Sequence, residues 1–485
     1  MALVITAVSI GAIGALIIWD LFTRIRNWYR LRHIPGPATA RWSKFWLVRR
    51  QFGGRLLQHL RDTTKKYGPV ARIGPRHVVV SDPPEIRRIW SIRSGYARSS
   101  WYAGLRFDPN RDSILTMTNN KTHHRVRSRL LPAYQAKGIT DQEQVLDEQV
   151  AKFVALIERK YLSTRATGAA GGGGFGRAFG YMDADDDFYG AIDALEGMLM
   201  PCALMALLPP LVWLVTSPLC KPFMPKKTDK TGVGRLLGVI DERVRVRYGE
   251  KKVRNMDVLQ ALVDSGLPRE EVEAEALVHL LGGTDTTAGA LRNTVFFLST
   301  NPVAYRRLQD EIDGAVGRVT RPVISDAECK ELRFLQACIK ESIRCWPPVS
   351  GLQGKMSDVD DVICRVRVPA HTHVMFGMFG VMRDKSVFGD NAEVFEPMRW
   401  LEAGPEQLKE MEGTQGMAFA SGTRWECLGK RLANVEMGKV LFELFHRFDF
   451  AMTNPIEPFK WTHLGFTLHE DMNVTITKRE SKPLA

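Results

Sequence analysis

The amino-acid sequence predicts a mainly α-helical protein with a small β-region. Residues 2–19 are almost wholly apolar, which predicts a hydrophobic helix at the N-terminus. Residues 269–300 read as one long helix, which Asn301-Pro302 would end. A further helix is predicted after Lys430, because apolar residues recur there at nearly helical spacing: Leu432, Val435, Val440, Leu441, Leu444, Phe445 and Phe448.

The N-terminal helix has the length of a membrane span. At ~1.5 Å per residue it would cover ~27 Å, close to the thickness of an endoplasmic reticulum bilayer. A cleaved signal peptide is the alternative, but neither a basic start nor a small-residue cleavage site is evident. Arginines at 24, 26, 30 and 32 favour a cytosolic position for the rest of the chain. We therefore expect a transmembrane anchor at residues 1–22, a basic and Pro-rich hinge at 23–40, and one large domain at 41–485.

Strand-like runs predict the β-region. Residues 69–73 and 77–80 read as two strands joined by Gly74-Pro75, after an amphipathic segment at 56–66. Residues 362–368 and 373–379 would complete the region. The very apolar stretch at 204–216 predicts either a loop that touches a membrane or a buried core segment.

Composition excludes several classes of protein. The net charge of +13 is spread along the chain without a nucleic-acid-binding signature, so it suits an acidic protein partner or an anionic membrane. Seven scattered cysteines without a Cys-x-x-Cys pair argue against a disulfide framework and against a zinc site. A reducing, cytosol-facing compartment fits best.

Cys427 stands immediately before the helix that begins at Lys430. Unpaired N–H groups and the positive end of the helix dipole would favour a thiolate there, and hence an anionic sulfur ligand. Gly422 and Gly429 would let the backbone approach a flat ligand. A buried free cysteine is the alternative for a lone Cys.

The stretch Phe419-Ala-Ser-Gly422-Thr-Arg424-Trp-Glu-Cys427-Leu-Gly429 resembles F-x-x-G-x-R-x-C-x-G, the haem-binding signature of the cytochrome P450 monooxygenases. Cys427 and Gly429 match it. One extra residue separates Phe419 from Cys427, so either Arg424 or Trp425 would take the place of the arginine that faces a haem propionate.

Three further motifs resemble those of the same family. His123 and Arg127 take the places of the pair that faces a haem propionate; a solvated basic helix face is the alternative. A second motif is Gly282-Gly283-Thr284-Asp285-Thr286-Thr287, which resembles [AG]-G-x-[DE]-T-[ST]. The resemblance implies that Asp285 and Thr286 relay protons beside bound dioxygen. The alternative is a kink in a core helix. Glu341, Arg344 and Arg399 resemble the E-x-x-R cluster, which supports folding.

The resemblance implies the cytochrome P450 fold, haem b held by Cys427, O2, and NADPH-derived electrons supplied by a membrane-bound NADPH–cytochrome P450 reductase. It also implies a single-pass protein of the endoplasmic reticulum membrane whose catalytic domain is cytosolic. Its substrate would be an apolar small molecule, with contacts, by position, from Trp101, Tyr102, Phe107, Val349, Leu352 and Phe466.

The narrower resemblance is to the fungal pisatin-demethylase-like group of secondary metabolism. Two alternatives remain open. One is a haem-thiolate isomerase or dehydratase that needs no reductase. The other is a haem-free, non-enzymatic membrane-anchored chain, because residues 164–178 lack the apolar helix usual in related chains, and 168–180 read as a glycine-rich flexible loop.

Overall fold

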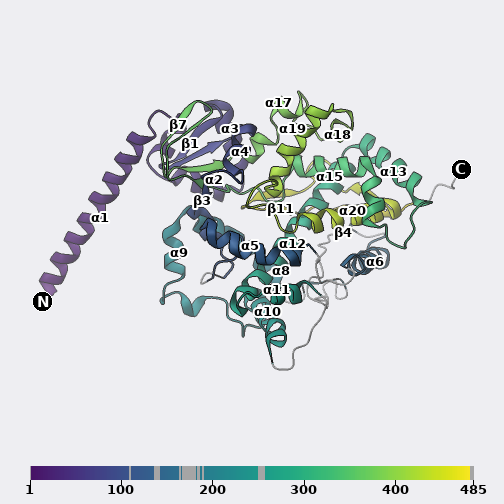
Figure 1. Ribbon diagram of the computed structural model, residues 1–485, viewed down its shortest axis with the longest axis horizontal. Helices are drawn as coiled ribbons and strands as arrows, with labels where there is room; N and C mark the ends of the chain where they lie inside the picture. The colour runs from purple at the N-terminus through teal and green to yellow at the C-terminus, as the bar shows by residue number, and fades with distance from the viewer. Residues whose placement is uncertain are drawn as a thin grey trace. The chain divides into compact units, whose positions relative to one another are not determined.

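The computed structural model describes residues 2–108, 111–135, 142–162, 165–166, 182, 186–187, 190–249 and 257–480 (Figure 1). The predicted loop at 168–180 lies outside the described residues. So does the rest of the 164–178 stretch, apart from Arg165–Ala166, which form strand β4. The chain divides into two compact units. The first holds Met1–Ser99 and Leu352–Val381, and the second holds Ser100–Gly351 and Met382–Ala485.

A five-stranded sheet forms the centre of the first unit. Its order is β1 (Val70–Gly74), β2 (His77–Val80), β8 (His373–Phe376), β5 (Lys355–Met356) and β3 (Ala97–Arg98), and only the β2–β8 pair is parallel. Every residue of β1 and β2 is buried, so both predicted strands are confirmed. The helices of this unit beyond α1 are η1 (Ala38–Arg41), α2 (Phe45–Phe52), α3 (Leu56–Tyr67), α4 (Pro83–Trp90) and α16 (Met378–Val381).

Two strand predictions in this unit need correction. The run at 362–368 is a hairpin, β6 (Asp361–Ile363) and β7 (Val366–Val368), because Cys364 and Arg365 take positive φ and reverse the chain. The run at 373–379 leaves the sheet after Phe376 and enters α16.

Helix α1 (Ala2–Arg30) runs eight residues beyond the predicted anchor, and Figure 1 shows it as one continuous helix. In the part of the chain that the structure describes, no helix combines the length and apolarity needed to cross a membrane. The predicted span is therefore not confirmed, and the three predicted segment boundaries remain predictions.

The predicted hinge is packed against β1. The buried guanidinium of Arg72 donates to backbone carbonyls at the end of α1, those of Asn27 and Trp28. The N–H of Arg72 in turn donates to the Pro35 carbonyl at 2.7 Å. A Cβ at Gly36 would lie 2.0 Å from the Arg72 carbonyl oxygen, so only glycine fits this crossing.

The second unit is mostly helical. Its elements are η2 (Ser100–Leu105), α5 (Asn120–Tyr134), α6 (Gln142–Lys160), β4, α8 (Ala191–Leu207), α9 (Pro209–Val215), η3 (Lys221–Phe223), α10 (Gly232–Tyr248), α11 (Val258–Asp264), α12 (Arg269–Ser299), α13 (Pro302–Val316), α14 (Asp326–Glu331), α15 (Arg333–Cys345), α17 (Lys385–Phe388), α18 (Arg399–Glu402), α19 (Pro405–Gln415), η4 (Gly416–Phe419), α20 (Lys430–Arg447), β9 (Phe448–Met452), β10 (Lys460–His463), β11 (Thr467–Glu470) and β12 (Val474–Lys478).

The long helices predicted from the sequence are present as α12 and α20. Asn301 ends the first and caps α13, where its side chain accepts the N–H of Ala304 and Pro302 occupies the first turn. The apolar stretch at 204–216 forms the end of α8 and all of α9 rather than a loop, and Pro209 starts the second helix.

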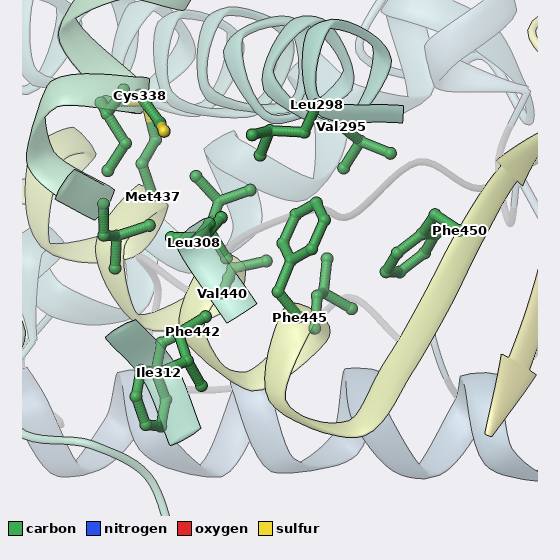
Figure 2. Close-up of a cluster of buried hydrophobic side chains, with 14 of the residues drawn as sticks. Val295, Leu298, Leu308, Ile312, Cys338, Met437, Val440, Phe442, Phe445 and Phe450 are labelled. Carbon is green, nitrogen blue, oxygen red and sulfur yellow. The ribbon is translucent and has the colours of Figure 1, made fainter. Parts of the chain in front are cut away.

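A hydrophobic core joins α12, α13, α15, α20 and β9. Figure 2 shows Met437, Val440, Phe442 and Phe445 of α20 among side chains of the other helices, with Phe450 of β9 at one side. Every residue from Met437 to Phe445 is buried, so this half of α20 is enclosed on all sides rather than amphipathic. Lys439 is tolerated there because it forms ion pairs with Glu143 and Asp147 of α6.

Candidate active site

The loop between η4 and α20 holds Cys427. Its N–H donates to the carbonyl of Phe419 at 2.9 Å, which closes the loop on itself. Ala420 and Gly422 both take positive φ, at 49° and 71°. Residues 420–423 form a turn in which the N–H of Thr423 donates to the Ala420 carbonyl at 3.2 Å.

The Cys427 thiol is exposed, yet protein surrounds it closely enough to remove most of its hydration. Burial raises its pKa, while the N–H of Gly429, the charge of Arg127 and the N–H of Lys430 act in the opposite direction. The groups that we expected to stabilise a thiolate are therefore present. Burial has the larger effect, so the pKa of Cys427 is raised.

Helix α5 places Arg127 beside this loop. Its Nη1 donates to the carbonyl of Glu426, the residue before Cys427, at 2.5 Å. His123 stands one turn earlier on α5 and is 2% exposed. The Asn119 side chain caps the helix by accepting the N–H groups of Lys121 and Thr122, which fixes the start of this turn.

The middle of α12 borders open space. Gly282 and Gly283 are exposed, and a Cβ at either position would meet no atom within 4 Å. Thr286 donates to the Gly282 carbonyl at 2.5 Å. Burial raises the pKa of Asp285, and the nearby charge of Arg292 only partly offsets this.

One apolar cluster connects these three elements. Leu428, next to Cys427, packs against a group that includes Val126 and Leu130 of α5 and Leu277 and Leu281 of α12. The predicted cysteine, basic pair and proton-relay residues thus come from segments that share a packed cluster.

Glu341, Arg344 and Arg399 lie together as predicted, in the core of the second unit. Arg344 donates twice to the Glu341 carboxylate, at 2.8 Å each, and Arg399 Nε donates to it at 2.9 Å. The Trp400 indole donates as well, at 2.9 Å. Burial opposes ionisation of Glu341, but the two arginines outweigh it and hold its pKa below the usual range. The side chains of Glu341 and Arg344 are fully buried, and the structural role expected for this cluster stays a prediction.

The predicted substrate contacts are brought together only in part. Val349 pairs with Phe466 in an isolated β-bridge, and the ring of Trp101 lies beside Gly351 and so close to this bridge. Tyr102 packs edge-on against Trp101. Phe107 belongs to the cluster of Leu428 instead. Leu352 is buried in the first unit, where its carbonyl accepts the N–H of Phe376.

Arg424 and Trp425 are the two candidates for the position of the arginine that faces a haem propionate. They lie side by side. The Arg424 guanidinium carbon is 5.4 Å from the centre of the Trp425 ring, and the indole is 6% exposed.

Sequence reasoning missed Glu436 of α20, whose pKa burial raises to about 7, with a smaller opposing effect from Thr287 of α12. The position of Glu436 in the sequence could have indicated that it is unusual. Glu436 is an acid on the apolar face of α20, four residues after Leu432 and four before Val440.

Comparison with known proteins identifies the family. The profile of the family described as Cytochrome P450 matches residues 34–475. The chain is 32% identical over 488 residues to the cytochrome P450 monooxygenase ABA1 of Pyricularia oryzae, covering 94% of each chain. It is 33% identical over 476 residues to aba1 of Botryotinia fuckeliana, covering 93% of this chain and 92% of that protein. It is 31% identical over 485 residues to abl1 of Leptosphaeria maculans, covering 93% of this chain and 84% of that protein.

These relatives are fungal proteins named as cytochrome P450 monooxygenases, in agreement with the fungal group that the sequence resembles. Because the family match spans most of the chain and the relatives align along nearly their whole length, the protein belongs to the cytochrome P450 family and is a monooxygenase.

Proposed function

We propose that this chain is a haem-thiolate monooxygenase in which Cys427 Sγ binds the iron of haem b. The observation that carries the proposal is the Cys427 thiol, enclosed by protein but accessible, directly before α20. The donor set fits a thiolate ligand, because the N–H groups of Gly429 and Lys430 point at the sulfur. A Cβ at Gly282 or Gly283 would meet no atom within 4 Å, which supports a ligand site beside this part of α12. When bound, a thiolate-ligated haem activates O2 for insertion into a C–H bond.

Several residues would hold the cofactor around that sulfur. Arg127 and His123 of α5 would face a propionate, since Arg127 already contacts the cysteine loop. Arg424 or Trp425 would supply a second contact. Phe419 supports the loop through its carbonyl, and Gly429 keeps the approach to the sulfur free of a side chain.

Asp285 and Thr286 would move protons to dioxygen. The raised pKa of Asp285 brings its titration closer to neutral pH, which suits a group that alternately takes and gives a proton. The Thr286 hydroxyl stands at the open side of α12, held by its bond to the Gly282 carbonyl. Its oxygen can accept a proton from one side while its hydrogen passes to the other.

The substrate would be an apolar small molecule of fungal secondary metabolism. The supporting observation is the aromatic and aliphatic group formed by Trp101, Tyr102, Val349 and Phe466. Phe107 and Leu352 are the further predicted contacts.

An NADPH–cytochrome P450 reductase would supply the electrons. The basic residues after Cys427 support an electrostatic contact with an acidic partner. Arg431 is exposed and free to serve this role, whereas Lys430 is half-buried and donates to Ser421 and Glu426.

The endoplasmic reticulum membrane would hold the chain as a single-pass protein through α1, with the catalytic domain in the cytosol. Large apolar side chains on α1 support attachment to a membrane: Ile17, Ile18, Trp19, Leu21, Phe22 and Ile25 are all exposed. The exposed Trp213, Leu219 and Phe223, in and after α9, support a further contact.

Reconstitution tests the proposal. The full chain is combined with reductase, and product formation from a panel of apolar compounds is measured with and without NADPH and O2. Product that requires both supports the monooxygenase. Product formed without NADPH supports the isomerase or dehydratase, and a chain that binds no haem supports the non-enzymatic alternative.

The relay residues are tested in the same assay. Asp285→Asn and Thr286→Ala should each lower product formation by about 10²-fold or more, because general acid–base groups contribute on that order. Thr300→Ala is the matched control, since Thr300 makes the same bond to the carbonyl four residues earlier at the far end of α12. A loss no greater than that of the control would contradict the assigned roles.

A further inference from the structure

The positive charge of the chain is concentrated in its first unit. That unit holds 21 of the 67 lysines and arginines but only 7 of the 54 aspartates and glutamates. The second unit, which contains Cys427, is therefore almost neutral, and the net charge of +13 belongs to the first. A partner that this net charge attracts would meet the first unit.

Two arginines of the first unit converge on the turn before β8. Arg30, the last residue of α1, donates to the Ala370 carbonyl at 2.6 Å. Arg76, between β1 and β2, donates to the His371 carbonyl at 2.7 Å. Among the residues that the structure describes, neither guanidinium forms an ion pair. Because a carbonyl group carries no net charge, both arginines lack a bound counter-charge.

Two further cations lie close to this pair. Burial lowers the pKa of Arg76, and the positive charges of Arg30 and Arg26 lower it further. Burial also lowers the pKa of Lys44 to about 8, with an additional effect from Arg76. These four side chains, from three segments, form a cationic cluster whose members repel one another. A bound anion would relieve this repulsion.

The acidic side chains of the turn before β8 have other partners. The N–H of Ala370 and the guanidinium of Arg367 hold the pKa of Asp360 below its usual range, and Arg30 adds only a smaller effect. Asp358 lies 3.4 Å from the ring of His371. These two acids therefore leave most of the charge of the cationic cluster uncompensated.

Aromatic side chains lie beside the cationic cluster. Trp42 stacks on Trp28 of α1, with 5.6 Å between the ring centroids, and its carbonyl accepts Arg24 Nη1 at 3.1 Å. These contacts attach the start of α2 to the end of α1. Four aromatic side chains of this region are between 44% and 61% exposed: Tyr29, Trp42, Phe45 and Phe52. Exposed aromatic groups beside cations are typical of a surface that lies at a membrane–water interface, and a soluble phosphate compound would not require them.

We propose that this part of the first unit binds the phosphate group of an anionic phospholipid. Arg30 and Arg76 donate to the phosphate oxygens, because a guanidinium can bind phosphate in a bidentate manner, and Arg26 and Lys44 complete the counter-charge. The exposed aromatic side chains lie at the level of the headgroups. The site goes beyond the proposed attachment through α1, since it selects lipids by charge, and it does not depend on the proposed haem chemistry.

Partition of the purified full chain between water and vesicles tests the site. The wild type should bind vesicles of phosphatidylcholine mixed with phosphatidylserine about 10-fold or more tightly than vesicles of phosphatidylcholine alone. The variant Arg30→Gln/Arg76→Gln should lose about 10-fold or more in affinity for the anionic vesicles, because each basic residue near an anionic surface adds about 5-fold. Its affinity for neutral vesicles should not change, since the apolar part of α1 is intact.

Two further variants separate the site from net charge and from folding. Arg93→Gln/Arg365→Gln removes the same charge from two exposed positions of the first unit outside the cationic cluster, and it should retain most of the preference for anionic vesicles. Arg26 is exposed and makes no hydrogen bond with the described residues, so Arg26→Glu reverses a charge without removing a contact. It should also weaken binding to anionic vesicles. The carbon monoxide spectra of all variants should match that of the wild type, because the second unit is unaltered.

Equal affinity of the wild type for both kinds of vesicle would overturn the proposal, and so would an equal loss in Arg93→Gln/Arg365→Gln. Binding of inorganic phosphate that is lost in Arg30→Gln/Arg76→Gln, without any preference among vesicles, would show a site for free phosphate and would also overturn it. Weaker binding of reductase by that variant, with unchanged vesicle binding, would assign the cluster to an acidic protein instead. None of these results depends on product formation, so they are distinguishable from failure of the proposed function.

Discussion

Glu341 shows how one residue holds several segments of the second unit in place. Its carboxylate accepts hydrogen bonds from α15, from α18 and from the N–H of Glu396, all without contact with solvent. Such a group is costly to bury alone and stabilising only with its partners present. We therefore propose that the cluster stabilises the relative positions of these segments and takes no part in the chemistry.

Removing the charge of Glu341 should be strongly destabilising. Glu341→Gln leaves the two buried arginines without a counter-charge, and we expect a loss of roughly 3–5 kcal/mol in the free energy of unfolding. Urea unfolding followed by fluorescence measures it. Asp390→Ala, which breaks the exposed Lys385–Asp390 pair, is the control and should change stability by less than about 0.5 kcal/mol. Equal effects of the two substitutions would contradict the assigned role.

Helix α12 carries a destabilising glycine pair at the position where the proposed oxygen site opens. A Cβ would meet nothing within 4 Å at Gly282 or Gly283, so packing does not require glycine at either position. Paired glycines in a helix interior are costly relative to alanine. We propose that these glycines instead keep open the space beside Thr286, whose hydroxyl donates to the Gly282 carbonyl.

Alanine at Gly282 or Gly283 should raise the stability of the protein and lower its activity. Gly282→Ala and Gly283→Ala should each raise the free energy of unfolding by up to about 1 kcal/mol, because helix propensity improves. Both should lower product formation, because the methyl group fills the space beside the hydroxyls. Gly289→Ala on the same helix is the control, since its Cβ would make an ordinary 3.8 Å contact with Pro348 and should leave activity unchanged. Stabilised variants with full activity would contradict this account.

Elements with a strong local signal could be predicted from the sequence. The limits of α12 and α20 follow from periodicity and from Asn301-Pro302, and β1 and β2 follow from runs of β-branched residues. The turn at Cys364 and Arg365 was missed, because neither residue type favours positive φ. The pairing of β6 with β7 closes the reversal, and the Glu85 carboxylate, far away in the sequence, accepts the N–H of Cys364.

The motifs proposed residues for the candidate site, and their assigned roles stay predictions. Cys427, Arg127 and Thr286 lie on segments that share one packed cluster. The burial that raises the pKa of Glu436 could not be predicted, because it depends on how α20 packs against its neighbours. The raised pKa of Cys427 was also not foreseen, since the local helix dipole gives no measure of burial.

At the scale of the whole molecule, the chain divides into two compact units. The first contains the five-stranded sheet and the packed hinge around Gly36. The second contains Cys427, α12 and the Glu341 cluster, so the proposed chemistry belongs to that unit.

The most direct test of the central claim is a carbon monoxide difference spectrum of the reduced full chain, expressed in microsomes. We predict the long-wavelength Soret band of thiolate-ligated haem for the wild type, and its loss in Cys427→Ser. Cys364→Ser is the matched control, since that cysteine is half-buried and lies in the first unit. A shorter-wavelength band in the wild type, no band at all, or a long-wavelength band that survives Cys427→Ser would contradict the assignment of Cys427 as the haem ligand.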